Sequence, residues 1–87
     1  MESQAENLRD VERMSIDNKR KIINYTVVCI NEFADKFSLS SKDAFTYLYN
    51  HKGIDFIKEN YEIEHTLSLD DAIEDLSIIC RNNGGNL

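Results

Sequence analysis

The stretch 17-DNKRKIINYTVVCINEFADKF-37 decides the fold. Its apolar side chains recur at alternating spacings of four and three residues, with a second row alongside, and this period predicts a long amphipathic helix. Ser15 or Asp17 offers the short side-chain oxygen that caps a helix start. So wide an apolar face indicates contact with more than one neighbour, which makes this the expected core helix. The first row is Ile23, Val27, Ile30, Ala34 and Phe37, and the second is Ile22, Thr26, Cys29 and Phe33.

The residues that follow predict two shorter helices. Ser40 is the expected N-cap of the first, because its hydroxyl can accept a free backbone N–H. Lys52 and Gly53 are expected to end that helix, since glycine suits the positive φ of a cap. The segment from Asp55 to Asn60 predicts a short third helix.

The next two segments differ in period. Residues 61–67 alternate apolar and polar side chains, which is typical of a strand. Because a single strand has no partner within this chain, we expect an extended connector, with strand pairing between molecules as the alternative. Ser68 is the expected N-cap of a last helix, which carries acids in its first turn and stops before Gly84 and Gly85.

These elements predict an all-α protein, a compact bundle or array of four helices. A fifth is expected if the polar residues 1–16 form a short helix rather than a tail. Residues 17–82 are expected to form a single domain and residues 83–87 a flexible C-terminal tail. The chain has 87 residues and no proline, which fits one small helical domain.

Charge is distributed unevenly along the chain. The net charge is −6, and residues 61–87 hold six acids against the single base Arg81, a local charge of −5. Such an acidic surface repels nucleic-acid backbones and anionic membranes, so both are unexpected partners. It suits a basic protein partner, and the alternative is a solvated face that only aids solubility.

The cellular compartment is inferred from the cysteines and the termini. The start, MESQAENLRD, lacks the basic and apolar regions of a secretory signal, and no apolar run reaches the roughly 20 residues that cross a bilayer. Two cysteines are too few for a disulfide framework. We therefore expect a cytoplasmic protein with free thiols.

Candidate catalytic and metal sites are weak, and we expect no enzyme activity, cofactor or metal. The sequence contains no phosphate loop, HExxH or nucleophile elbow. Zinc binding would need closer ligand pairs than Cys29, Cys80, His51 and His65 provide. A Cys29–His65 catalytic pair is disfavoured because Cys29 lies on the apolar face of the core helix.

A small DNA-associated regulator is the alternative function. A helix, a glycine turn and a short helix across residues 41–60 are typical of a helix-turn-helix. The second helix offers only Lys58 as a base, against Asp55 and Glu59. The single basic cluster, residues 19–21, lies far along the chain, so phosphate binding is disfavoured.

The chain resembles a family of short bacterial helical proteins of unknown function. The likeness covers about residues 20–80. The chain departs from the family at Phe56, where tyrosine is common, and at Leu67, where family members often have a polar residue after the His-Thr pair. Members are often encoded beside toxin-like proteins, including ones similar to ADP-ribosyltransferases. The resemblance therefore implies a partner-binding, antitoxin-like role. The matching residues are Cys29, Ile30, Glu32, Phe33, Ser40, Lys42, Gly53, Asp55, Phe56, Ile57, Tyr61, His65 and Thr66.

The hypothesis that results is a small protein-binding module whose partner is basic or toxin-like; a second copy of the chain is the other partner considered. Binding residues often lie on connectors, which makes the His65–Thr66 pair a candidate contact. The alternative is that His65 ties the connector to a helix end by hydrogen bonds. The acids of the last helix complete the candidate surface. Its residues are Tyr61, Glu62, Glu64, His65, Thr66, Asp71, Glu74 and Asp75.

Overall fold

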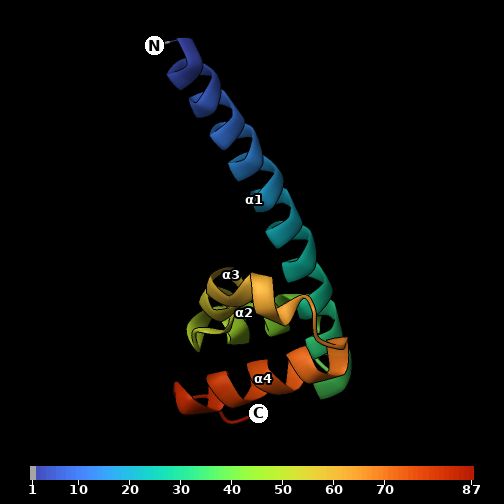
Figure 1. Ribbon diagram of the computed structural model, residues 1–87. Coiled ribbons are helices and arrows are strands. Elements are labelled where there is room, and N and C mark those ends of the chain that lie inside the picture. The colour runs from blue at the N-terminus through green and yellow to red at the C-terminus, as the bar shows by residue number, and fades with distance from the viewer. Residues whose placement is uncertain (1) are drawn as a thin grey trace.

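A computed structural model describes the backbone of residues 2–87 and the side chains of residues 16–87. Its elements confirm the all-α bundle of four helices, and the described residues contain no strand. Figure 1 shows α2, α3 and α4 gathered around the C-terminal half of α1, while the N-terminal half of α1 extends away from them. The molecule is therefore elongated, 54 × 23 × 21 Å. The helices are α1 (Glu2–Phe37), α2 (Ser41–Asn50), α3 (Gly53–Glu64) and α4 (Leu69–Asn82).

The long helix begins earlier than the sequence pattern indicated. It starts at Glu2 and runs through residues 15–17 without interruption, so the proposed caps Ser15 and Asp17 lie inside it. Residues 2–16 are therefore part of α1 and do not form a separate short helix. No helix in the described part of the chain is both long and apolar enough to cross a membrane.

Only part of the predicted apolar face of α1 is buried. Cys29 and Phe33, from the second row, are completely enclosed. Ile23 and Val27, from the first row, are 61% and 50% exposed. The two rows lie side by side on the helix, and the other three helices cover the second row more fully than the first.

The turn between α2 and α3 uses glycine for a different reason from the one predicted. Ser40 caps α2 as expected, its Oγ accepting from the backbone N–H of Asp43 at 3.1 Å. The residue with positive φ is Lys52, at 70°, and not Gly53. A Cβ on Gly53 would lie 2.8 Å from Leu48 Cδ2 and 3.1 Å from Cys80 Sγ, so this glycine lets α3 approach α2 and α4 closely.

The prediction of an extended connector at Tyr61 to Leu67 is wrong. α3 continues to Glu64 after a kink at Asn60, whose φ of −118° is not helical. The alternation of apolar and polar residues suggested a strand, but the apolar positions are not the buried ones: Ile63 is 65% exposed, whereas Glu64 is buried. Two i→i+3 backbone bonds, from Thr66 to Ile63 and from Leu67 to Glu64, then close the helix end.

The last helix follows the prediction closely. Ser68 caps it through a bond from the backbone N–H of Asp71 at 3.1 Å. Ile73, Leu76 and Cys80 are buried against α1, α2 and α3. The end of the segment predicted as a flexible tail, residues 83–87, lies against the core, because the N–H of Leu87 donates to the Tyr47 hydroxyl at 3.0 Å and its side chain packs there.

Candidate functional site

A groove of about 480 Å³ lies between the last two turns of α1 and the first half of α4. Four carboxylates and one ammonium group line it, and an isoleucine supplies its apolar surface. At neutral pH the lining has a formal charge of −3. The lining residues are Glu32, Asp35, Lys36, Asp70, Ile73 and Glu74.

Core packing positions these side chains. Phe33 and Ala34 are buried, so their neighbours Glu32 and Asp35 fall at the border between core and solvent. The same relation holds on α4, where Ile73 is buried and Glu74 is exposed. The acidic groove thus follows directly from the burial of the two helices against each other.

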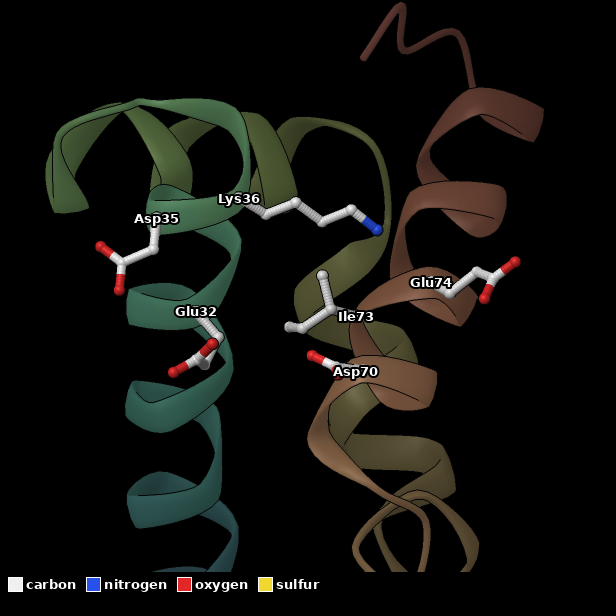
Figure 2. Close-up of a pocket in the computed structure, with 6 residues that line it drawn as sticks. All are labelled: Glu32, Asp35, Lys36, Asp70, Ile73 and Glu74. Carbon is white, nitrogen blue, oxygen red and sulfur yellow. The ribbon is translucent and has the colours of Figure 1, made fainter.

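The close-up shows how the groove is arranged. Lys36 extends from α1 toward α4, and Ile73 projects from α4 toward α1 (Figure 2). Asp35 and Glu74 point away from the space between the helices, on its two sides. The space between the helices thus holds Ile73 and the Lys36 side chain, with carboxylates on both sides. Those carboxylates suit the charged head of an incoming lysine or arginine.

A second hollow of about 400 Å³ continues the groove toward the C-terminal end of α4. It shares Lys36 and Glu74 with the first, and its lining adds Phe37, Ser77, Arg81 and Leu87. Arg81 and Lys36 make this end basic. A partner that spanned both hollows would need basic groups at one end and an acidic group at the other.

Metal binding finds no support in the geometry of the described residues. Among them, no three His, Cys, Asp or Glu side chains gather closely enough to hold an ion.

A pair of carboxyl groups, Glu64 of α3 and Asp75 of α4, lies beside this region. Glu64 is only 6% exposed, and its Oε2 has no hydrogen-bond partner among the described residues. Burial, followed by the hydrogen bond and the charge of Asp75, raises the pKa of Glu64 to about 7. Protonation of Glu64 near neutral pH weakens the repulsion between the two carboxyl groups.

The surroundings of this pair are aromatic and sulfur groups of α1 and α3. The Tyr25 hydroxyl donates to the backbone carbonyl of Glu64 at 3.1 Å, and its ring meets the Tyr61 ring edge-on at 5.5 Å. Burial raises the pKa of the nearby Cys29 thiol to about 11, so this thiol is protonated at neutral pH. Cys29 is fully enclosed, which is the opposite of what a nucleophile needs.

The predicted pair His65 and Thr66 has a structural role at the end of α3. Nδ1 of His65 lies 2.7 Å from the Tyr61 carbonyl oxygen, and the Thr66 hydroxyl donates to the Ile63 carbonyl at 2.6 Å. The His65 ring also stacks on Tyr61, 4.5 Å between ring centres. Both side chains are exposed, so a partner contact by His65 or Thr66 stays a prediction.

The eight predicted contact residues lie on α3, at its end and on α4, and they differ in exposure. Only Glu74 lines the acidic groove, and Glu64 is buried with Asp75. Glu62 and Asp71 are exposed outside the groove lining. The sequence analysis did not predict Asp70 or the groove residues of α1 as contacts. Acidic residues next to the buried positions of the long helix could have indicated them.

Comparison with known protein families identifies the family of this chain. Residues 24–83, which are 60 of the 87, match the family described as "Protein of unknown function (DUF3791)", and the chain belongs to this family. This confirms the resemblance to a family of unknown function. Neither the curated proteins nor the solved structures give a match.

Proposed function

We propose that this family member is a non-catalytic binding module that takes a basic segment of a protein partner into the α1/α4 groove. The observation that carries the proposal is the groove itself, with four carboxylates and one lysine around the apolar Ile73. Of the partners considered, a basic toxin-like protein encoded nearby fits this chemistry best, which would make the role antitoxin-like.

The charge of the whole chain supports the same partner. The net charge of −6 attracts a basic protein from a distance, and the acids of residues 61–87 concentrate that attraction near α4. Charge complementarity of this kind raises the rate of association and selects against acidic partners. The rims then supply direct hydrogen bonds to ammonium or guanidinium groups.

The rigidity of the groove walls also supports docking. Both walls are helices anchored by fully enclosed residues, Phe33 on α1 and Cys80 on α4. A preformed site loses little conformational entropy when it binds. The two buried thiols, each with a pKa raised to about 11 mainly by burial, favour a module without nucleophilic chemistry.

DNA binding is the alternative function, and the exposed residues of α3 do not favour it. This helix carries Lys58 as its single base, while Asp55, Glu59 and Glu62 are exposed acids. Phosphate contacts need clustered cations.

The test is to measure the affinity for the toxin-like protein encoded beside the gene, by titration calorimetry. Wild-type protein should bind at micromolar concentration or below. The double variant Asp35→Lys/Glu74→Lys should bind at least about tenfold more weakly. No complex with the wild type, or equal affinity of the groove variant, would contradict the proposal.

A matched control separates the groove from general electrostatics. Glu59→Lys/Glu62→Lys makes the same change of charge on α3, outside the groove, and should keep the wild-type affinity within about threefold. If this control loses as much affinity as the groove variant, binding depends on net charge and the groove has no special role. Fluorescence anisotropy with duplex DNA at low salt tests the alternative; binding there would favour the regulator.

A further inference from the structure

Between residues 16 and 27, α1 carries apolar side chains that are at least half exposed. Every described side chain from Ile16 to Lys21 is exposed. Ile16, Ile23 and Val27 are 52%, 61% and 50% exposed, and their spacings of seven and four residues put them on one side of the helix. Such a stripe on a projecting helix (Figure 1) marks a surface for another helix.

A largely apolar groove of about 400 Å³ opens beside this stripe, between α1 and α3. Its lining is Ile22 and Ile23, with Lys19 from α1 and Lys58 from α3. The fold thus brings together two lysines that lie far apart in the sequence. Apolar surface between two ammonium groups suits a helix with apolar residues flanked by acids.

The chain itself contains a segment of that charge. Residues 2–12 hold four acids and one base, a charge of −3, whereas residues 13–21 hold four bases and one acid, a charge of +3. If two copies of α1 pack antiparallel, the negative part of each meets the positive part of the other. Parallel packing would place like charges together.

We propose that a second copy of the chain covers Ile16, Ile23 and the groove beside them, forming a twofold dimer through antiparallel α1 helices. A twofold axis between residues 12 and 13 sets residue 2 opposite residue 23 and residue 6 opposite residue 19. The start of each helix then lies in the Lys19–Lys58 groove of its partner. The overlap is about 33 Å at 1.5 Å per residue. A twofold contact closes on itself, so assembly stops at two.

The dimer also accounts for the projecting helix. An isolated helix of a few turns is marginal in water, and most helices in proteins are stabilised by packing on an apolar face. The second copy supplies that packing. The surface is separate from the α1/α4 groove, which lies at the other end of α1, so the dimer does not depend on the proposed function.

The experiment measures mass by sedimentation equilibrium for the wild type, Lys19→Glu/Lys58→Glu and Glu2→Lys/Glu6→Lys. Wild-type protein should be a dimer whose dissociation constant rises with salt. Each variant alone should dissociate at least about tenfold more readily, because both of its groove contacts become repulsive. An equimolar mixture of the two variants should dimerise again, since every contact then joins opposite charges.

Controls exclude general effects of charge and folding. Lys42→Glu/Lys52→Glu changes two exposed lysines outside α1 and should leave the mass unchanged. Circular dichroism of each variant should show a folded helical protein. A monomeric wild type, a variant mixture that stays monomeric, or variants that dimerise like the wild type would each overturn the antiparallel dimer.

Discussion

The two halves of α1 share one apolar period but have different surroundings. In the C-terminal half, Cys29, Phe33 and Ala34 are buried among the other helices. In the N-terminal half, the described side chains from Ile16 to Lys21 are exposed, although the apolar spacing reaches back to Ile16. Periodicity thus identifies a helix and its apolar side, but the number of neighbouring helices decides how much of that side is covered.

Substitutions in the two halves should have very different effects on stability. Phe33 is fully buried, and its ring lies 4.6 Å from that of Phe37 and 5.6 Å from that of Tyr47. Phe33→Ala should lower the free energy of unfolding by about 3–5 kcal/mol. Urea unfolding followed by circular dichroism measures this change.

Ile23→Ala is the matched control at an exposed position of α1. It should change the unfolding free energy of the monomer, measured at high dilution, by less than about 0.5 kcal/mol, because Ile23 is largely exposed. Equal losses for the two variants would mean that the two halves do not differ in packing, and the comparison would fail.

The junction of α1, α3 and α4 should make stability depend on pH. Burial and the neighbouring Asp75 raise the pKa of Glu64 to about 7, above its unfolded value near 4.5. Between these values the folded protein holds a proton that the unfolded chain releases. The contribution of this group is therefore fully present below about pH 4.5 and is lost as the pH rises through about 7.

Unfolding between pH 5 and pH 8 tests this effect. Wild-type protein should lose up to about 3 kcal/mol of stability over this range, and Glu64→Gln, which keeps the shape without the charge, should remove most of that dependence. Tyr25 and Cys29 of α1 also lie near Glu64, and burial raises the pKa of each further above this range. Glu62→Gln, on the exposed side of α3, should leave the dependence unchanged.

The sequence predicts most of the fold because its local signals are strong. Ser40 and Ser68 cap the helices that their spacing indicated, and the stripe of Ile73, Leu76 and Cys80 is buried as expected. The prediction failed at residues 61–64, where an alternating pattern coincides with a buried acid, Glu64. Tertiary contacts there outweigh the local period.

The candidate site was less predictable because it joins distant segments. Acids of α4 were predicted as contacts, but the groove is completed by Glu32 and Asp35 of α1, which lie some forty residues earlier. Likewise, Lys19 and Lys58 share a groove only because α3 packs on α1. Sequence patterns describe one element at a time, so a surface formed by two elements can be predicted only when their packing is known.

Gly53 tests whether the packed half depends on close approach of the short helices. A Cβ at this position would press on Leu48 and Cys80, which are both fully buried. Gly53→Ala should therefore lower the unfolding free energy by about 1–3 kcal/mol, even though alanine favours helix formation. Gly84→Ala is a useful contrast: it meets no atom within 4 Å, so any loss there comes from its φ of 92°. No loss at Gly53 would mean that α2, α3 and α4 adjust easily.

The smallest expected effect lies at the border between the two halves of α1. Among the side chains that the structure describes, Tyr25 is the first from the N-terminus to bond to another helix, through the 3.1 Å hydrogen bond to the Glu64 carbonyl. Tyr25→Phe removes that bond but keeps the ring contact with Tyr61, and the carbonyl still accepts from the Leu67 N–H. The loss should be about 0.5–1 kcal/mol in urea unfolding. Val28→Ala, on an exposed side of the same turn, should cost less. A larger loss for Val28 would place an unrecognised contact on that side of α1.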